Sequence, residues 1–555
     1  MPHIKQHIAD LAEICRKKGI TRVIISPGSR SAPLIKAFYE VFGESCISIV
    51  DERSAAYFAL GTALYTQKPV ALICTSGTAV LNYAPALAEA YYQQVPLLAV
   101  TADRPREWID QQDNQTIRQS GIYGNYVKGS FELPQAITSE DDLRFAHRLM
   151  NEALNLCTSA GKGPVHINVP LAEPLYDDLP SASENIRIIQ QIEPEISVKL
   201  PEELVEEWKS ANSIMILHGQ DLPGSAVSGL LPLLSNDGRI IIFAENIANT
   251  PGAGILSNSN LVLSKIRDLT PDYPDLIIHS GGQVVSKALT GYLRRAKKVS
   301  CWRIGNDRGL IDTFRQVSRI IPYPSTAVYR ALGDLSLRQT DSSYGKRWHT
   351  LATHANKLSE EAIEQAEFSD LRVFNLVLRS IPSGTSVVLG NSSIIRYAQI
   401  FPAPENLNYY ANRGVSGIDG CISTGVGIAH ASGKSTLVIT GDLGFLYDSN
   451  AIWNRELPAN LKILVINNGG GGIFHILKGP SEHPGFKKFI EAHHPVNIHK
   501  LADAFGLAYF CAENEPDLGK QWDSFIRINR QAALMEVKTN AAISAATFRT
   551  LMRPA

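Results

Sequence analysis

The stretch STLVITGDLGFLYDSNAIWNRELPANLKILVINNGGGG, residues 435–472, decides the fold of the last third of this 555-residue chain. It holds two apolar runs, residues 435–440 and 461–467, and each run ends in polar residues and glycine. A segment long enough for a helix, residues 447–457, lies between the two runs. This order predicts a right-handed βαβ unit whose two strands are parallel and lie side by side or nearly so.

Asp442 and Asn468 directly follow these two predicted strands. Because the carboxyl ends of parallel strands meet at one edge of a sheet, we expect the carboxylate and the carboxamide to face one point. Such hard oxygen donors suit Mg²⁺ (or Mn²⁺), which completes its shell with phosphate oxygens and water. Gly441 and Gly470 add backbone that can approach closely, and Gly470 offers a carbonyl for the metal. A Gly-Asp pair alone would more often cap a helix, but its combination with the asparagine and glycine run favours a metal and diphosphate site.

The same alternation of apolar run, polar turn and helix-like segment occurs throughout the chain, and it predicts an α/β fold. We expect three domains, each built on a mainly parallel sheet flanked by helices, at residues 1–178, 200–335 and 368–555. A polar stretch, residues 177–203, is expected to link the first two domains, and a largely helical connection, residues 336–367, the last two. The predicted strands are 21–26, 46–50, 70–76, 96–100, 213–219, 239–245, 275–282, 298–305, 386–391, 435–440, 461–467 and 534–538.

Composition narrows the class of protein. Lys plus Arg (53) nearly balance Asp plus Glu (54), so no global charge attracts nucleic acid or a membrane surface. The seven cysteines are scattered and never form a C-x-x-C pair, which favours a reducing cytoplasm over a disulfide framework. No stretch is apolar enough to be a signal peptide or to span a bilayer. We therefore expect a cytoplasmic protein with small-molecule partners, no nucleic acid and no membrane.

GDL at residues 441–443 and NNGGGG at residues 467–472 together resemble the signature of thiamine-diphosphate enzymes, with Leu443 where the usual signature has a third glycine. Glu52, after the second predicted strand, has the position of the glutamate that such enzymes use on the cofactor. A carboxylate bonded to the pyrimidine nitrogen favours the imino tautomer, whose exocyclic nitrogen removes the thiazolium proton. A lone glutamate beside Arg53 would more often be a solvated or helix-capping acid. The resemblance also implies a homodimer or homotetramer with active sites at the subunit interface.

Six further segments look closely like the MenD family, the menaquinone-pathway synthases that join 2-oxoglutarate to isochorismate. They are SPGSRSAPL (26–34), DERSAAYFALG (51–61), TSGTAV (75–80), TADRP (101–105), NQTIRQ (114–119) and NRGVSGIDG (412–420). The resemblance implies a transferase that decarboxylates 2-oxoglutarate and adds the succinyl carbanion equivalent to isochorismate in a conjugate (1,4) sense.

The resemblance also assigns the site residues. Those implied for isochorismate are Ser29, Arg30, Arg104, Asn114, Gln115 and Lys287. Those implied for 2-oxoglutarate are Ser392, Arg396 and Arg413. Ile418 would brace the cofactor, and Ile473, Phe474 and Leu477 would form an apolar wall, although core packing is the simpler interpretation of these four. Ala288 follows Lys287 where the family can have arginine. The four arginines suit four substrate carboxylates, since guanidinium groups bind carboxylates bidentately.

Three alternatives stay open. Another thiamine-diphosphate carboligase or 2-oxo-acid decarboxylase would share the cofactor residues but would need fewer arginines. A catalytically silent dimeric scaffold would share the fold, but the intact Glu52 argues against it. His493, His494 and His499 could suggest zinc, although adjacent histidines point in different directions, so surface or loop roles are preferred.

Overall fold

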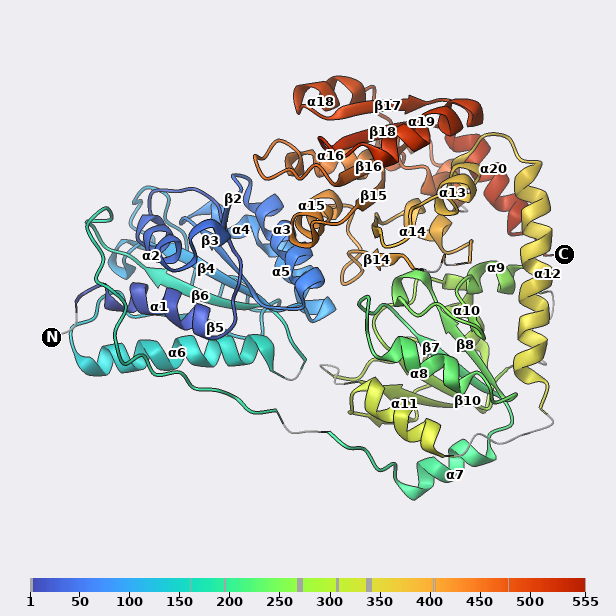
Figure 1. Ribbon diagram of the computed structural model, residues 1–555, viewed down its shortest axis with the longest axis horizontal. Helices are drawn as coiled ribbons and strands as arrows, with labels where there is room; N and C mark the ends of the chain where they lie inside the picture. The colour runs from blue at the N-terminus through green and yellow to red at the C-terminus, as the bar shows by residue number, and fades with distance from the viewer. Residues whose placement is uncertain are drawn as a thin grey trace. The chain divides into compact units, whose positions relative to one another are not determined.

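Three six-stranded sheets flanked by helices make up the computed structural model of the chain (Figure 1). The structure describes residues 3–159, 161–193, 196–266, 273–305, 309–335, 342–402, 404, 406–477 and 479–554. The chain divides into two compact units. The first unit contains Met1–Pro194, Asn412–Gly433 and Tyr447–Leu461, and the second contains Glu195–Ala411, Lys434–Leu446 and Lys462–Ala555.

The sheet of the first unit has the strand order β2-β1-β3-β4-β6-β5, and all its pairs are parallel. Its strands are β1 Val23–Ile25, β2 Cys46–Ser48, β3 Val70–Cys74, β4 Leu97–Asp103, β5 Ser130–Glu132 and β6 Val165–Pro170. Its main helices are α1 Gln6–Lys17, α2 Ala32–Phe42, α3 Glu52–Thr66, α4 Thr78–Asn82, α5 Ala84–Gln93 and α6 Glu140–Thr158. Residues of α1, α2 and α6 share one apolar core with this sheet.

The central sheet has the order β12-β11-β10-β7-β8-β9 and is also parallel. Alternate residues of β7 lie in different cores: Ile214 and Ile216 pack on one face, Met215 and Leu217 on the other. Burial of both faces explains why such strands are continuous apolar runs. The strands are β7 Ile214–His218, β8 Ile240–Ala244, β9 Ile255–Leu256, β10 Leu276–Ser280, β11 Ser300–Ile304 and β12 Arg319–Ile321. The helices are α7 Glu202–Ser210, α8 Val227–Leu234, α9 Ser259–Ser264, α10 Lys287–Arg295, α11 Ser325–Asp334 and α12 Tyr344–Glu364.

The third sheet has the order β14-β13-β15-β16-β18-β17. Its strands are β13 Ser386–Leu389, β14 Asn408–Tyr410, β15 Thr436–Gly441, β16 Leu461–Asn467, β17 Ala508–Ala512 and β18 Ala533–Lys538. Its helices are α13 Asp370–Leu378, α14 Ser393–Ala398, α15 Cys421–Ser432, α16 Asp442–Tyr447, α17 Ile473–Ile476, α18 Ile498–Ala504, α19 Glu515–Arg527 and α20 Ala541–Leu551. Counted from its own first strand, this sheet has the order 2-1-3-4-6-5, the same as the sheet of the first unit.

The central sheet instead has the doubly wound order 6-5-4-1-2-3, whose switch point lies between β7 and β10. Ligands of such sheets usually bind in the crevice at that point. Here two loops fill it with backbone, because the Gly219 amide donates to the Ser280 carbonyl and the Gly282 amide to the Gln220 carbonyl. A Cβ built on Gly219 would lie 2.0 Å from the Gly282 carbonyl oxygen, so the two loops meet without side chains between them.

The predicted α/β fold of three parallel sheets is confirmed, and every predicted strand that lies inside a sheet is present. The helix expected at residues 447–457 is wrong. The chain forms α16 directly at Asp442 and then only a short 3-10 turn, Ser449–Ala451. Residues 336–341 of the expected helical connection lie outside the described residues, and α12 forms most of the remainder. The domain boundaries stay a prediction.

The first half of the predicted linker is not loose. Asp10 of α1 accepts hydrogen bonds from the backbone and the hydroxyl of Ser183, at 2.7 and 2.8 Å. Asn151 of α6 donates to the Arg187 carbonyl and accepts from the Ile189 amide. These buried polar groups hold residues 181–189 on the first unit. Among the helices that the structure describes, none is both long and apolar enough to cross a membrane.

Candidate active site

Asp442 begins α16 immediately after β15, and its side chain is almost fully buried. Its Oδ1 accepts from the Leu443 amide at 2.7 Å, and its Oδ2 accepts from the Gly470 amide at 2.8 Å. Burial raises the pKa of Asp442, while these amides and the nearby His494 lower it. The carboxylate is therefore oriented by backbone from both neighbouring strand ends.

Asn468 directly follows β16, and only the nitrogen of its side-chain amide has a hydrogen-bond partner among the described residues. Its Nδ2 donates to Asp370 Oδ2 at 3.1 Å. Its Oδ1 is buried and has no hydrogen-bond partner within the described residues. A buried carbonyl oxygen without a donor is costly unless another group, such as a cation, satisfies it. The expected pairing of Asp442 and Asn468 at one sheet edge agrees with this geometry, since the Gly470 amide contacts Asp442 two residues after Asn468.

The glycine run after Asn468 approaches its neighbours too closely for side chains. Gly470 has φ 153°, and a Cβ there would lie 2.7 Å from the Glu491 carbonyl oxygen. A Cβ on Gly472 would lie 2.5 Å from Asn468 Nδ2. The Gly470 carbonyl accepts from the Gly472 amide at 2.9 Å and keeps a second lone pair. Carboxylate, amide oxygen and peptide carbonyl are the donor set that Mg²⁺ takes, so these residues fit the implied metal.

His494 was not expected at this place. Its Nε2 lies 3.3 Å from Asp442 Oδ2, and its side chain is 11% exposed. His493 contacts the Gly469 carbonyl through Nδ1 at 2.7 Å, whereas His499 stacks on Tyr509. The three histidines thus have different partners, and His494 lies in a loop, as preferred, with a side chain that is mostly buried. The pair HH gives no signal of this in the sequence, because the contact depends on how the loop after β16 returns.

Two other predicted site residues of the second unit lie together. Arg396 of α14 donates through Nη1 to the Ser392 carbonyl at 2.5 Å. Ser392 has φ 69°, a left-handed conformation that costs a non-glycine residue energy and often marks a functional position. Lys287 is exposed at the first position of α10, where Ser286 caps the helix. No contact brings Lys287 to Ser392 or Arg396 among the residues that the structure describes.

The four apolar residues predicted for the site differ in burial. Ile473 is buried, Phe474 is half-buried, and Leu477 is 41% exposed. Ile418, in the first unit, is 39% exposed. Core packing therefore accounts for Ile473, but it does not account for Leu477 or Ile418.

Glu52 is the first residue of α3, and Asp51 caps this helix by accepting from the Ser54 amide at 2.7 Å. Burial raises the pKa of Glu52, nearby Asp51 raises it further, and a hydrogen bond from Asn82 lowers it. Arg53 turns to Tyr447 instead, lying 4.7 Å from its ring centroid and donating to its carbonyl. The Arg53 side chain is thus directed to Tyr447, and Glu52 is half-buried at the start of the helix.

The turn that carries Arg413 and Ile418 packs on the helices of the first unit. Tyr57 of α3 donates to Asp419 at 2.7 Å. Glu89 of α5, which is fully buried, accepts from the amides of Gly414 and Val415. Sequence reasoning missed Tyr57 and Glu89, although an acidic residue inside the apolar helix segment APALAEAYY was a signal for the latter.

Three of the six residues predicted for isochorismate contact other parts of the chain. Arg30 is buried, donates to the Leu171 carbonyl at 3.0 Å and lies 3.1 Å from Glu173. Gln115 donates to the Ser76 carbonyl at 2.9 Å. Arg104 lies 3.5 Å from Asp113. Ser29 and Asn114 are exposed. Gln115 thus braces the turn after β3, a role that the sequence did not indicate.

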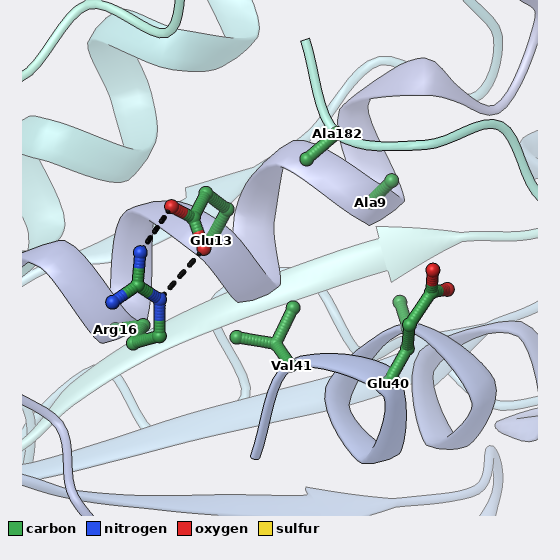
Figure 2. A pocket seen from close by; sticks show the side chains of 7 residues that line it. Ala9, Glu13, Arg16, Glu40, Val41 and Ala182 are labelled. Atoms are coloured by element: carbon green, nitrogen blue, oxygen red, sulfur yellow. Dashed lines mark hydrogen bonds and ion pairs between the residues drawn. The ribbon is translucent and has the colours of Figure 1, made fainter. Parts of the chain in front are cut away.

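A hollow of about 260 Å³ lies elsewhere on the first unit, between α1, α2 and Ala182 (Figure 2). Glu13 and Arg16 line it, and they bind each other through two hydrogen bonds of 2.8 and 2.6 Å. Since no predicted site residue lines it, this hollow is not the candidate active site.

Comparison with known proteins defines the class. Residues 7–122 match the family model "Thiamine pyrophosphate enzyme, N-terminal TPP binding domain", and residues 389–537 match the corresponding C-terminal TPP binding domain. The first range contains Glu52 and the second contains Asp442, Asn468 and Gly470. The protein is a thiamine-diphosphate enzyme, as its sequence predicted.

Relatives over nearly the full length define the family. The 2-succinyl-5-enolpyruvyl-6-hydroxy-3-cyclohexene-1-carboxylate synthase of Desulfotalea psychrophila is 41% identical over 92% of this chain and 95% of its own. The synthases of the same name from Flavobacterium johnsoniae (95% of each chain) and Porphyromonas gingivalis (96% of this chain, 94% of its own) are 37% and 36% identical. The chain belongs to the family of 2-succinyl-5-enolpyruvyl-6-hydroxy-3-cyclohexene-1-carboxylate synthases, and the predicted MenD resemblance is confirmed.

Proposed function

We propose that this chain decarboxylates 2-oxoglutarate and adds the remaining succinyl unit to isochorismate in a conjugate (1,4) sense. The product is 2-succinyl-5-enolpyruvyl-6-hydroxy-3-cyclohexene-1-carboxylate, formed with release of carbon dioxide and uptake of one proton. The observation that carries the proposal is the match of more than 90% of the chain to relatives named for this product.

The groups proposed for the metal and the diphosphate come from the second unit. Asp442, Asn468 Oδ1 and the Gly470 carbonyl would hold Mg²⁺ (or Mn²⁺), and Gly441 would allow the diphosphate to approach the backbone. Bound thiamine diphosphate supplies the electron sink that allows a 2-oxo acid to lose carbon dioxide and its acyl carbon to form a new bond. The buried, unpartnered Asn468 oxygen supports this assignment.

Glu52 would be the catalytic acid, holding a proton at the pyrimidine ring nitrogen. Its raised pKa supports this role, since a carboxyl group that is not held strongly ionised shares a proton more readily. Its position at the start of α3 fixes its backbone, because the Asp51 cap and the packing of α3 hold the first turn in place.

The remaining polar groups would bind the substrates. Ser392, Arg396 and Arg413 would hold 2-oxoglutarate, and Arg396 and Ser392 already lie together. Ser29, Arg30, Arg104, Asn114, Gln115 and Lys287 would face isochorismate. Arg30 donates through Nη1 to the Leu171 carbonyl and its Nη2 lies 3.1 Å from Glu173, so a substrate carboxylate would take the place of the exposed Glu173 side chain.

The half-exposed and exposed apolar residues would exclude water from the reacting carbon. Ile418 and Leu477 keep about two fifths of their surface exposed, 39% and 41%, although each is fully apolar. Apolar side chains line most ligand pockets, so these two residues suit this role. Without such cover, water would protonate the acyl carbon that should attack isochorismate. The succinyl unit would then leave as an aldehyde, and no new carbon–carbon bond would form.

We further propose a homodimer or homotetramer that works in the cytoplasm. The match to thiamine-diphosphate enzymes supports this assembly, because that resemblance implies active sites at the subunit interface. Sedimentation with and without cofactor would measure the state, and a fully active monomer would contradict the proposal.

Incubation with 2-oxoglutarate, isochorismate, Mg²⁺ and thiamine diphosphate tests the function, with mass analysis of the product. We expect the 2-succinyl product, formed only when all four components are present. Carbon dioxide release with an unrelated aldehyde acceptor, and none with isochorismate, would favour the alternative carboligase. Chelation of the metal should release the cofactor, and unchanged retention would count against Asp442 and Asn468 as ligands.

A further inference from the structure

We infer that Asp370 is a positioning residue for the metal: it fixes the carboxamide of Asn468 so that the oxygen, and not the nitrogen, faces the cation. The inference rests on the proposed metal site and extends it to a residue outside the two family-model matches. Asp370 begins α13 and is 1% exposed.

The two ends of an asparagine amide have nearly the same shape but opposite chemistry. The oxygen can bind a metal, whereas the NH₂ group has only hydrogens to present. A half-turn of the side chain would therefore replace a ligand by a group that repels a cation. Some neighbour of Asn468 must prevent this rotation if the site is to be formed before the metal arrives.

Asp370 has the contacts needed for this. Its Oδ1 accepts from the hydroxyls of Thr539 at 2.6 Å and Ser544 at 3.0 Å, and its Oδ2 accepts from Asn468 Nδ2 at 3.1 Å. The Asp370 amide donates to the Ser544 oxygen at 3.0 Å, which directs the Ser544 proton toward the carboxylate. The carboxylate is held on three sides and presents an acceptor to Asn468.

The neighbouring asparagine shows that this arrangement is specific. Asn467 uses both ends of its amide, since its Nδ2 donates to Glu536 at 2.6 Å and its Oδ1 accepts from the Gly469 amide at 3.1 Å. Only the nitrogen of Asn468 is used among the described residues, and its oxygen is buried without a partner. Of the two adjacent asparagines, the one bonded to Asp370 keeps its oxygen for a ligand.

The test exchanges the carboxylate at position 370 and the carboxamide at position 468, first one at a time and then together. Asp370→Asn presents an amide that can donate to the Asn468 oxygen, so the NH₂ group of Asn468 can turn toward the metal. We expect the affinity for Mn²⁺, measured by electron paramagnetic resonance with thiamine diphosphate present, to fall about tenfold or more. Asn468→Asp alone brings two carboxylates together and should also weaken the site.

The double variant Asp370→Asn with Asn468→Asp restores a donor at position 370 facing an acceptor at position 468, with a second oxygen left for the metal. We expect its Mn²⁺ affinity to return to within a few fold of the wild type. Unchanged affinity of Asp370→Asn would overturn the inference. A double variant no better than the weaker single variant would also overturn it.

Thr539→Val is the control for a purely structural role, because it removes one hydrogen bond to the same carboxylate without touching Asn468. We expect it to lower the melting temperature but to leave Mn²⁺ affinity within about twofold. An equal loss of affinity in this control would make Asp370 a general support of the fold. If the wild type itself binds no metal and cofactor, the proposed function fails. If it binds them and Asp370→Asn binds them equally, only this inference fails.

Discussion

The phenol of Tyr57 donates a 2.7 Å hydrogen bond to Asp419. Tyr57 lies one and a half turns into α3, the helix that begins with Glu52, and Asp419 follows Ile418 in the turn before α15. A Cβ on Gly420 would lie 2.2 Å from the Tyr57 ring, so the ring and the turn are packed without space between them. This one contact connects the helix of the proposed catalytic glutamate to the turn of the proposed cofactor brace.

Tyr57→Phe should lower the free energy of unfolding by about 1–2 kcal/mol, because it removes the donor to a half-buried carboxylate and leaves the ring in place. Urea unfolding measures the change. Tyr39→Phe is the matched control, since Tyr39 is 57% exposed and should tolerate the loss of its hydroxyl. Equal stability of the two variants would show that the Asp419 contact contributes nothing.

Glu52→Gln should reduce kcat by about a hundredfold or more, the usual contribution of a placed proton donor, while the protein stays folded and binds cofactor. Glutamine keeps the shape of the side chain but carries no ionisable proton. Steady-state turnover and a cofactor titration measure the two effects. Glu44→Gln, at an exposed position, should have wild-type turnover, and wild-type turnover of Glu52→Gln would remove the assigned role.

Gly61→Ala and Gly427→Ala should each destabilise the first unit by about 1–3 kcal/mol through overpacking. A Cβ on Gly61 would lie 2.0 Å from the Thr424 carbonyl oxygen, and one on Gly427 would lie 2.1 Å from that of Phe58. Helices α3 and α15 therefore touch through their backbones at these glycines. Thermal unfolding measures the cost.

Gly519→Ala is the control for the glycine variants, because a Cβ there meets nothing within 4 Å inside helix α19. Alanine favours the helix over glycine, so this variant should be stabilised by about 0.5–1 kcal/mol. Unchanged or raised stability of Gly61→Ala and Gly427→Ala, as expected for Gly519→Ala, would instead indicate that helix propensity, and not packing, decides the result.

Eleven of the twelve interior strands in the part of the chain that the structure describes could be predicted from the sequence, β6 being the exception, whereas most edge strands could not. Strand β7 is buried on both faces and is therefore a continuous apolar run, whereas β5, at the edge of its sheet, has one exposed and two half-buried residues. Of the six edge strands within the described residues, five were missed for this reason; they are β5, β9, β12, β14 and β17. Edge strands are short and polar, so apolar periodicity does not reveal them.

The candidate site shows the same limit. Asp442 and Asn468 could be predicted because each directly follows a buried strand, and strand ends of a parallel sheet converge. Asp370 could not, because it precedes Asn468 by 98 residues and meets it only through the packing of α13. Its local pattern, Ser369-Asp370 before an apolar run, is that of an ordinary helix start.

His166 should make stability depend on pH. Burial lowers the pKa of His166 from 6.5 to about 3. Between these values the unfolded chain binds a proton that the folded chain does not, so stability is constant above about pH 6.5 and falls as the pH decreases toward 3. The loss from this group should be about 2 kcal/mol between pH 7 and pH 5.

His166→Asn removes this titration and should flatten the slope of unfolding free energy against pH by that amount. It also loses the contacts of the ring with the hydroxyls of Thr101 and Ser130, which lowers stability at every pH. Measurement at pH 8 isolates that constant cost, since His166 is neutral there in both states. An unchanged slope would mean that the imidazole of His166 binds as many protons in the folded protein as in the unfolded chain, and so does not contribute to the pH dependence.

Glu89→Gln should weaken the use of 2-oxoglutarate more than the binding of thiamine diphosphate. The Glu89 carboxylate accepts from the amides of Gly414 and Val415, the latter at 2.8 Å, and these residues follow Arg413 directly. A glutamine must direct its NH₂ group at one of these amides, whichever way it turns, so the turn must shift and Arg413 with it. We expect the KM for 2-oxoglutarate to rise about tenfold, as for loss of a well-placed charged hydrogen bond. Glu152→Gln, at an exposed position of α6, should leave both constants unchanged. Equal increases for substrate and cofactor in Glu89→Gln would instead show that Glu89 supports the fold of the turn and not the placement of Arg413.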